Sequence, residues 1–321
     1  MNHSNTLRLL ITGATGFIGK NLCKRAVSDG WDVRPVTRDT EIVGGVKIGD
    51  LSVNTDWSVA LKNVDIVIHL AARVHIMDDT ANNPLEEYRR INTDATLTLA
   101  KQAEKSGVKR FIYLSTIKVN GESTLPGSRF KPDDEFIPTD PYALSKYETE
   151  QGLLKIARES QMEIVIIRPP LVYGPEVKAN FLSMMKWTHK RIPLPFGAIH
   201  NKRSFVALDN LVDLILTCIN HPAAANQVFL VSDGEDLSTT ELLNRVSVAL
   251  DKKPGLLPVN QQLLEFILTL IGKKELAKRL FASLQIDISK TKEMLNWSPP
   301  VSVDQQLKKT AQHFLESSRY E

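Results

Sequence analysis

The sequence predicts an α/β protein built on a doubly wound parallel sheet, and three observations lead to this fold class. Short apolar runs alternate with stretches of helical periodicity from residue 7 to residue 168, as in repeated strand, helix and strand units. The runs are almost wholly apolar, which is typical of strands covered by helices on both faces. A glycine-rich turn, residues 13–19, joins the first run to the first helix.

Six strands are expected before residue 170. They are Leu7–Thr12, Asp32–Thr37, Val46–Gly49, Ile66–Leu70, Arg110–Ser115 and Glu163–Arg168. One helix is expected over residues 16–29 and another over residues 92–106, because each stretch is followed by a glycine, the residue preferred just after a helix.

The second half of the chain is less regular. Turns become frequent after Pro169 and Pro170, and a helix-bearing segment at residues 206–220 precedes a strand at residues 228–231. We expect residues 1–170 to form the main domain, with residues 205–232 returning to it. Residues 171–204 and 233–321 are expected to form a smaller C-terminal lobe.

Composition narrows the classes of function. The 321 residues include 40 Lys and Arg against 37 Asp and Glu, and the net charge of +3 is spread along the chain. This pattern lacks the basic block of a nucleic-acid surface. Cys23 and Cys218 are far apart and form no CxxC pair, so neither a disulfide framework nor a metal site is expected.

Two segments bear on location. Met1–Arg8 is short and polar, unlike a secretory signal, so a cytoplasmic protein is expected. Leu263–Ile271 is the most apolar stretch, but it contains Glu265 and is too short to cross a bilayer, so no transmembrane segment is expected. A buried helix is predicted there, and an amphipathic contact with a membrane face is the alternative.

The glycine-rich turn predicts a Rossmann-type dinucleotide site. Its three glycines follow a strand and open a helix, where small residues let the backbone approach a pyrophosphate and helical N–H groups stabilise the negative charge. The residues expected to bind the cofactor here are Gly13, Gly16, Phe17, Ile18 and Gly19. The main domain is therefore expected to bind NAD(P).

Tyr142 and Lys146 are candidate catalytic residues. They are four positions apart and share one face of a predicted helix, so the ammonium can lie near the phenol and lower its pKa. A phenol with a lowered pKa is a usable general acid or base.

The chain resembles the extended short-chain dehydrogenase/reductases, the NAD-dependent epimerase/dehydratase family. It is similar in particular to bacterial UDP-4-keto-6-deoxy-N-acetylhexosamine 4-reductases and to UDP-glucose 4-epimerase-like proteins. The resemblance covers Leu7 to about Pro300 and includes the GxxGxxG spacing. Its other motifs are Gly49-Asp50-Leu51, His69-Leu70-Ala71-Ala72, Asn92, Ser115-Thr116, Tyr142 to Lys146, Arg168 to Pro175 and Arg203.

The resemblance implies roles at the reacting end of the site. Thr116 would hydrogen-bond the reacting sugar oxygen, Tyr142 would transfer the proton, and Lys146 would hold the nicotinamide ribose. Ser115 is expected to face the opposite side of its strand.

The resemblance also implies cofactor contacts outside the glycine turn. Asp50 and Leu51 would contact the adenine, and Ala71 and Ala72 would pass beneath the cofactor. Asn92 has two interpretations of equal weight: a simple helix cap, or the family role of supporting the active site.

One departure from NAD-preferring relatives concerns the end of the second strand. Thr37 stands where those relatives have an acidic residue, and the next residue, Arg38, is suited to pairing with a 2′-phosphate. Asp39 supplies a carboxylate if the loop is shifted. NADP(H) is therefore the favoured cofactor, and NAD(H) is the alternative.

Substrate contacts are expected in the smaller lobe. By resemblance, Arg203 would hold the diphosphate of a UDP-sugar, and Asn180 would contact the same substrate. Lys278 and Arg279 lie near a second phosphate position of the family but out of register with it. Lys118 is expected to be an exposed loop residue, or else to reach the substrate.

Three functions are weighed, and the first is favoured. It is reduction of the C4 keto group of a UDP-2-acetamido-2,6-dideoxy-4-hexulose in the synthesis of surface polysaccharide (O-antigen) sugars. The alternative is a UDP-hexose 4-epimerase, for glucose or N-acetylglucosamine, with tightly bound NAD. Leu171, where epimerases commonly have Asn, counts against it.

The third function is a non-catalytic nucleotide sensor, which is disfavoured because both Tyr142 and Lys146 are present. By resemblance, a homodimer is expected to form through the helices that follow Asn92 and surround Tyr142.

Overall fold

The computed structural model describes residues 7–73, 83–272 and 274–318 of the chain, so the polar start at residues 1–6 lies outside the described residues. Within this part a seven-stranded parallel sheet has the order β3-β2-β1-β4-β5-β6-β9. The strands are β1 (Arg8–Thr12), β2 (Asp32–Thr37), β3 (Val46–Lys47), β4 (Ile66–His69), β5 (Arg110–Leu114), β6 (Glu163–Arg168) and β9 (Gln227–Leu230). The predicted fold class is confirmed, with strand ends within two residues of those expected.

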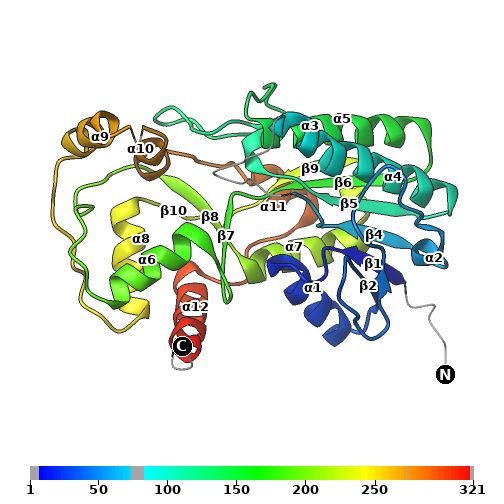
Figure 1. Cartoon of the computed structure of the whole chain (residues 1–321), viewed down its shortest axis with the longest axis horizontal. Helices are drawn as coiled ribbons and strands as arrows, with labels where there is room; N and C mark the ends of the chain where they lie inside the picture. Colours follow the sequence, from blue (N-terminus) through cyan, green and yellow to red (C-terminus); the bar gives the residue numbers. More distant parts are fainter. Residues whose placement is uncertain (1–6, 74–82, 273, 319–321) are drawn as a thin grey trace.

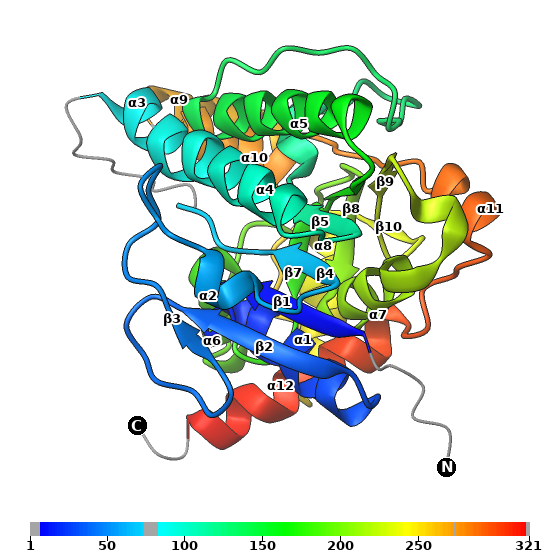
Figure 2. The ribbon, with the colours of Figure 1, turned by 90° about the vertical axis from the view of Figure 1, so that its right-hand side faces the viewer.

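Helices cover both faces of this sheet (Figure 2). They are α1 (Phe17–Ser28), α2 (Ser58–Leu61), α3 (Pro84–Tyr88), α4 (Ala95–Lys105), α5 (Pro141–Glu159), α7 (Leu208–Asn220) and α11 (Ser289–Leu295). Alternate strand residues point to opposite faces. In β1, Leu9 packs in the core with α1 and α7, whereas Leu10 packs in the core with α4 and α5.

The strand order reverses beside β1. From β1 the chain first adds β2 and β3 on one side and then β4, β5 and β6 on the other. Loops that leave the carboxyl ends of β1 and β4 therefore diverge, and ligands bind in the crevice that such a reversal opens.

A second, three-stranded sheet has the order β10-β8-β7 and lies beside the main sheet (Figure 1). Its elements and surrounding helices are β7 (Leu171–Tyr173), β8 (Arg203–Ala207), β10 (Asp236–Leu237), α6 (Ala179–His189), α8 (Thr239–Ala249) and α12 (Val303–Ser317). The expected return at residue 205 begins inside β8, which pairs with β7 and β10; the return to the main sheet begins with α7.

Two helices, α9 (Gln261–Leu270) and α10 (Lys274–Phe281), lie at the end of the molecule remote from β1 and β2 (Figure 1). The prediction of a buried helix at residues 263–271 is wrong. Leu264 is buried, but Leu263, Phe266 and Leu270 are more than half exposed. Within the described residues, no helix combines the length and apolar character needed to cross a membrane.

Candidate active site

The glycine turn between β1 and α1 is shaped by close backbone contacts. Gly13 has a φ of +68°, and a Cβ there would lie 2.9 Å from the backbone nitrogen of Ala71. A Cβ on Gly19 would overlap the carbonyl of Gly13. These positions require glycine, because any side chain would push the turn away from β4 or from α1.

The N-terminus of α1 is open to an anion. Gly16 caps the helix without a side-chain hydrogen bond from the described residues, and no acidic residue lies in the first turn. The N–H groups and the helix dipole therefore favour a phosphate at this position.

A cavity of about 720 Å³ lies over this turn, at the carboxyl ends of β1, β2 and β4. Its volume is in the range of small-molecule and cofactor sites. It gathers ten of the predicted cofactor residues: Gly13, Gly16, Phe17, Ile18, Gly19, Arg38, Asp50, Leu51, Ala71 and Ala72. The narrow backbone cradle, the open helix end and this volume fit a dinucleotide.

Arg38 lines the cavity together with the carboxylates of Asp39 and Asp50. Its Nε donates to Asp39 at 2.8 Å, and its Nη1 lies 3.7 Å from Asp50. The guanidinium is 69% exposed, and its neighbours raise its pKa, mainly through the Asp39 hydrogen bond. A 2′-phosphate would therefore compete with two existing carboxylates for this cation.

Lys146 is buried where α5 crosses the carboxyl end of β5. Its Nζ donates to the Leu114 carbonyl at 3.0 Å and lies 4.6 Å from the centre of the Tyr113 ring. Burial lowers the pKa of Lys146 to about 7, although the Glu150 carboxylate opposes this shift. The side chain can therefore gain or lose a proton near neutral pH.

Two contacts bring the segment of Thr116 to the start of α5. The first is the bond from Lys146 to Leu114, and the second is an ion pair of 3.7 Å between Lys118 and Asp140. Asp140 also caps α5 by accepting from the Ala143 N–H at 2.9 Å. Lys118 is thus a half-buried, paired residue, and the expectation that it is an exposed loop lysine is wrong.

Thr116 occupies the step from β5 into a short 3-10 turn, η2 (Ile117–Val119). Its backbone is extended, with φ of −156°, and its side-chain oxygen accepts weakly from the Lys118 N–H at 3.4 Å. Thr116 is half-buried, whereas its neighbour Ser115 is fully buried. The two side chains therefore differ in access, and Thr116 has the more accessible hydroxyl.

The expected lowering of the Tyr142 pKa is not what the structure gives. Burial raises the pKa of this phenol, and the neighbouring Asp140 carboxylate and Tyr88 raise it further. The physical reason is burial, which disfavours the charged phenolate more than any neighbouring group does. The ring of Tyr142 packs edge-on against Tyr88, with centroids 5.8 Å apart.

Asn92 joins the cofactor cavity to the Tyr–Lys helix. It lies inside a π-helical turn, η1 (Arg89–Asp94), between α3 and α4, so the helix-cap interpretation is wrong. Its amide donates to Ser145 Oγ and to the Arg73 carbonyl, both at 3.1 Å, and accepts from the Arg73 N–H at 2.8 Å. The loop that starts at Ala71 is thereby tied to α5.

His69, a buried residue of the His69-Leu70-Ala71-Ala72 motif to which the sequence analysis gave no role, holds the same loop. Thr12 Oγ1 accepts from the N–H groups of Leu70 and Ala71, both at 3.2 Å, so its own proton points to His69 Nδ1 at 2.8 Å. His69 Nε2 then donates to Thr96 at 2.9 Å. Burial lowers the pKa of His69 to about 3, which keeps the ring neutral. The sequence signal for this role was a histidine at the end of a strand, two positions before Ala71.

Glu150 and Arg168 form a second group that the sequence did not assign. Their buried ion pair measures 2.6 Å, and Arg168 also donates to Asn120 at 3.0 Å. Glu150 lies one helical turn after Lys146 and favours its charged form. This i+4 spacing was the signal that could have identified Glu150.

The predicted substrate residues lie apart from the cofactor cavity, which neither Asn180 nor Arg203 lines. Arg203 begins β8, and its guanidinium donates to the Ala282 carbonyl at 2.9 Å. Burial lowers its pKa, and it forms no ion pair within the described part of the chain. Asn180 is exposed at the start of α6. Lys278 is a surface residue 3.5 Å from Glu122, and the side chain of Arg279 lies outside the described residues.

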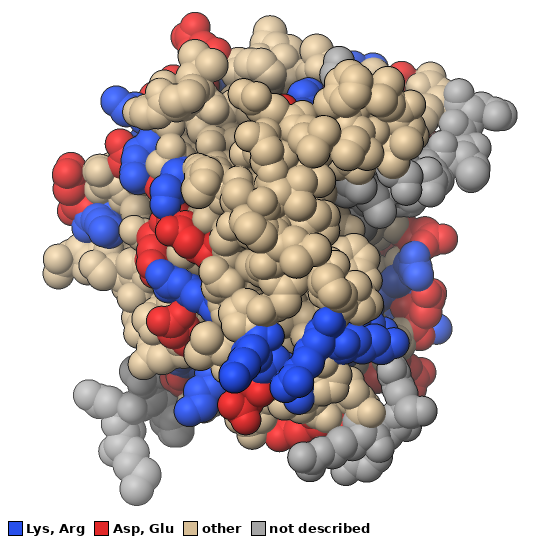
Figure 3. Space-filling view, turned by 90° about the vertical axis from the view of Figure 1, so that its left-hand side faces the viewer, with Lys and Arg blue, Asp and Glu red and all other residues tan. Residues whose placement is uncertain are grey.

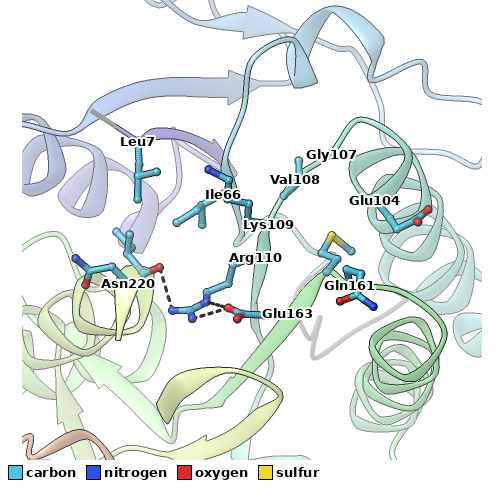
Figure 4. Close-up of a pocket in the computed structure, with 12 residues that line it drawn as sticks. Leu7, Ile66, Glu104, Gly107, Val108, Lys109, Arg110, Gln161, Glu163 and Asn220 are labelled. Carbon is cyan, nitrogen blue, oxygen red and sulfur yellow. Dashed lines mark hydrogen bonds and ion pairs between the residues drawn. The ribbon is translucent and has the colours of Figure 1, made fainter. Parts of the chain in front are cut away.

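A second cavity, of about 500 Å³, opens at the opposite, amino-terminal edge of the sheet (Figure 4). Arg110 lies in it but is already satisfied. It donates to Glu163 at 2.7 Å and to the carbonyls of Cys218 and Ile219 at 2.7 and 3.0 Å. The pair is structural, because it ties β5 and β6 to the end of α7. The described residues contain no group of three or more His, Cys, Asp or Glu arranged to hold a metal ion.

A glycine-cradled cavity at a strand-order reversal, joined through Asn92 to a Tyr–Lys helix, defines a nicotinamide-dependent enzyme of the Rossmann type. Sequence comparison agrees, since the model of a family described as "NAD dependent epimerase/dehydratase family" matches residues 9–232. The chain belongs to this family, and the resemblance noted from its motifs is confirmed.

Three similar proteins span nearly the whole chain. A Vibrio cholerae protein named UDP-glucose 4-epimerase is 50% identical, covering 97% of this chain and 96% of its own length. An N-acetyl-alpha-D-glucosaminyl-diphospho-ditrans,octacis-undecaprenol 4-epimerase of Escherichia coli O157:H7 is 27% identical, covering 95% and 94%. The structure of UDP-glucuronic acid 4-epimerase from Bacillus cereus with NAD has a TM-score of 0.76 at 22% identity, covering 97% and 99%.

Proposed function

We propose that the chain is a UDP-sugar 4-epimerase that holds its dinucleotide in the 720 Å³ cavity. The observation that supports the proposal is a pair of interactions between the segment of Thr116 and the start of α5, which carries Tyr142. They are the hydrogen bond from Lys146 to the Leu114 carbonyl and the ion pair between Lys118 and Asp140. They hold the segment of the Thr116 hydroxyl against the start of the helix that carries the Tyr142 phenol, at the carboxyl edge of the sheet. The 50% identity to the Vibrio cholerae protein named UDP-glucose 4-epimerase supports the choice of reaction.

The reaction needs a hydride carrier and a proton carrier. A nicotinamide cofactor held at the glycine turn, residues 13–19, would supply the first, a reversible hydride transfer at C4 of the sugar. Tyr142 would have to be the phenolate to take the proton of the 4-hydroxyl, becoming the neutral phenol that later returns it. The positive nicotinamide of a bound oxidised cofactor would favour that phenolate and oppose the burial that raises the pKa of Tyr142. Thr116 hydrogen-bonds the oxygen of the 4-hydroxyl, and Lys146 positions the cofactor ribose.

The substrate is proposed to lie between this edge and a smaller lobe made of residues 171–204 and 233–321, with residues 1–170 as the NAD(P)-binding domain. Arg203 is the proposed contact of the diphosphate. Its guanidinium is half-buried, and its described partner is a backbone carbonyl, so a charge-assisted hydrogen bond to an anion would offset the loss of water that lowers its pKa. Asn180 is proposed to contact the same substrate from the start of α6.

A second candidate, 4-keto reduction of a UDP-2-acetamido-2,6-dideoxy-4-hexulose, is favoured by two observations. Arg38 lines the cavity where a 2′-phosphate would lie, and net reductases commonly draw on NADPH. Leu171 stands where epimerases commonly have Asn, and its side chain is 44% exposed. The form of the cofactor therefore separates the two candidates: NAD(H) for the epimerase and NADP(H) for the reductase.

The deciding experiment uses the purified full chain with two substrates. Interconversion of UDP-glucose or UDP-N-acetylglucosamine with its C4 epimer, without added reduced cofactor, would support the epimerase. Stoichiometric loss of absorbance at 340 nm with a UDP-4-keto-6-deoxy-N-acetylhexosamine and NADPH would instead support the reductase and overturn the epimerase.

We also propose that the chain forms a homodimer through α4 and α5, as resemblance predicts. Sedimentation velocity of the purified chain tests this proposal. A single monomeric species at micromolar concentration would contradict it.

A further inference from the structure

Helix α9 and its surroundings carry a cluster of exposed apolar side chains. We call this cluster the α9 surface: Trp187, Ile192, Leu257, Leu263, Phe266, Ile267, Leu270 and Ile271. Each is between 41% and 69% exposed, and Leu270 and Phe266 are the most exposed, at 69% and 61%. Apolar side chains gathered in one region mark an interaction surface, whereas single ones are normal.

Within the part of the chain that the structure describes, the outer portions of these side chains stay uncovered. The other side of α9 supplies Leu264 to a small core with Ile199, Ala277 and Phe281. That side anchors the helix to α10 and to the main body of the smaller lobe. A helix that is apolar on its anchored side and on its outer side has more apolar area than its own fold buries.

Paired loops extend the surface beyond α9. The N–H of Leu194 donates to the Gly255 carbonyl at 2.9 Å, and the N–H of Leu257 donates to the Leu194 carbonyl at 2.8 Å. This pairing places the segment of Ile192 beside the segment that leads into α9. Trp187 lies one turn before Ile192 at the end of α6, where the Ile192 N–H donates to the Trp187 carbonyl at 3.1 Å.

Basic residues border the apolar side chains. Lys186, Lys190, Arg191 and Lys253 are exposed. Lys186 directly precedes Trp187 in the chain, and Lys190 and Arg191 are the two residues before Ile192. Figure 3 shows a broad uncharged face with a group of Lys and Arg along its lower edge. The acidic residue of α9, Glu265, is half-buried and accepts from Gln261 at 2.8 Å, so it adds little negative charge to the outer side.

We propose that the α9 surface docks the protein peripherally on a membrane that contains acidic phospholipids. An apolar helix face with aromatic side chains and a border of Lys and Arg suits the boundary between headgroups and acyl chains. A symmetric dimer through the same surface would bring two basic borders together, whereas acidic headgroups complement them.

Docking would place the substrate side of the smaller lobe close to the bilayer. Ala282, whose carbonyl accepts from Arg203, directly follows α10. Asn201 also donates to the carbonyls of Leu280 and Ala282, both at 3.2 Å. The proposed diphosphate contact is therefore held at the end of α10, the helix whose Ala277 and Phe281 pack in one core with Leu264 of α9.

Vesicle flotation of the full chain tests the apolar part of the surface. The vesicles are phosphatidylcholine with phosphatidylglycerol, compared with phosphatidylcholine alone. The variant Phe266→Ser/Leu270→Ser should bind the mixed vesicles about tenfold or more weakly than wild type, since each side chain loses its transfer from water. Val27→Ser is the matched control, because Val27 is a helical residue, 62% exposed, on α1.

The charged border is tested separately. Lys186→Glu/Lys190→Glu should abolish the preference for phosphatidylglycerol, and wild-type binding should weaken in high salt. Lys24→Glu/Lys62→Glu, which changes two exposed lysines of the main domain, should leave the preference unchanged.

A third measurement reports contact at one side chain. Tryptophan emission should shift to shorter wavelength when mixed vesicles are added, and Trp187→Phe should remove the shift. Equal vesicle binding by wild type and by Phe266→Ser/Leu270→Ser, or no binding by wild type, would overturn the proposal. So would a change from dimer to monomer in that variant, seen by sedimentation, without a change in flotation, because the surface would then join two copies of the chain.

Turnover of UDP-sugar without vesicles separates this proposal from the proposed function. Unchanged turnover and thermal melting of Phe266→Ser/Leu270→Ser would show a folded enzyme whose lost flotation supports docking. Failure of all UDP-sugar turnover in wild type would contradict the proposed function and leave the flotation result to decide docking by itself.

Discussion

The cofactor end and the substrate end of this protein are built in different ways. A continuous part of the cofactor cavity lining comes from one local turn, which supplies Gly13 and residues 15–19. The proposed substrate residues Asn180 and Arg203 come from α6 and β8, and Arg203 is held by Ala282, about eighty positions further along the chain. A site made by one local turn is readable as a motif, whereas a site assembled from distant segments is not.

The two ends also respond differently to substitution. A side chain added to the glycine turn meets backbone atoms that cannot move aside. Loss of the Arg203 side chain would remove a charge but leave the Ala282 carbonyl exposed to incoming water. The first kind of change is expected to damage the fold, and the second is expected to damage substrate affinity alone.

The largest expected effect comes from Tyr142, which lies between the two ends. Tyr142→Phe should lower turnover by about 10²- to 10⁴-fold, because it removes the proton carrier. Cofactor affinity should stay within a few-fold, which a fluorescence titration with NADH or NADPH checks. Tyr147→Phe, on the same helix, is the control. Retained turnover in Tyr142→Phe would refute the acid/base role.

Gly19→Ala should distort the glycine turn that forms part of the cofactor cavity. Its Cβ would overlap the Gly13 carbonyl, so the turn or α1 must shift, at a cost of about 1–3 kcal/mol or more in the free energy of unfolding. Weaker dinucleotide binding and a lower melting temperature are expected together. Gly255→Ala is the control, because its Cβ would come no closer than 3.6 Å to another group. Equal stability of the two variants would contradict the steric argument.

Arg203→Ala should weaken substrate binding without weakening cofactor binding, because Arg203 lies at the proposed substrate end and does not line the cofactor cavity. KM for the UDP-sugar should rise about 10- to 100-fold, the effect of losing a charge-assisted hydrogen bond. The melting temperature and cofactor affinity should change little. Lys202→Ala, the exposed neighbour, should leave KM unchanged. An unchanged KM in Arg203→Ala would end the assignment of the diphosphate to this residue.

The pH dependence of stability reports on Lys146. Its pKa is lowered from 10.5 to about 7 in the folded state, so between these values the unfolded chain binds more protons. The contribution of Lys146 to the free energy of unfolding should therefore increase as pH rises from about 7 to 10.5. Lys146→Met should flatten this rise in urea unfolding experiments, and Lys155→Met, an exposed lysine of the same helix, should not. Parallel curves for wild type and Lys146→Met would contradict the lowered pKa.

The smallest effect is expected at Arg38, because its guanidinium is largely exposed and already paired with two carboxylates. Arg38→Ser should raise KM for NADPH more than KM for NADH, which initial rates with each nucleotide measure. A parallel change in both values would remove Arg38 as the basis for cofactor preference.

Much of the main sheet was predictable because its signals are local. The strands are continuous apolar runs, and the glycine turn and the Tyr142–Lys146 spacing each lie within a few residues. The smaller lobe was predicted less well. β8 pairs with strands 30 residues on either side, and nothing near residue 205 in the sequence specifies that partner.

Three site properties depended on neighbours that the sequence does not place. The pKa of Tyr142 rises because the folded chain buries the phenol and places Asp140 and Tyr88 near it. Asn92 lies within a π-helical turn and reaches Ser145, more than fifty positions away. The apolar segment that predicted a buried helix forms α9, whose outer side is exposed because only Leu264 of this helix is buried in the core of the lobe.

The sequence by itself determined the fold class, the dinucleotide turn and the identity of the Tyr–Lys pair, because each depends on spacing within one element or across one turn. Tertiary structure decided the protonation of Tyr142, Lys146 and His69, the partner of Arg203 and the exposure of α9. These properties depend on which distant groups exclude water from a side chain or supply its hydrogen bonds, and burial changes the free energy of a charge more than any neighbour in sequence does.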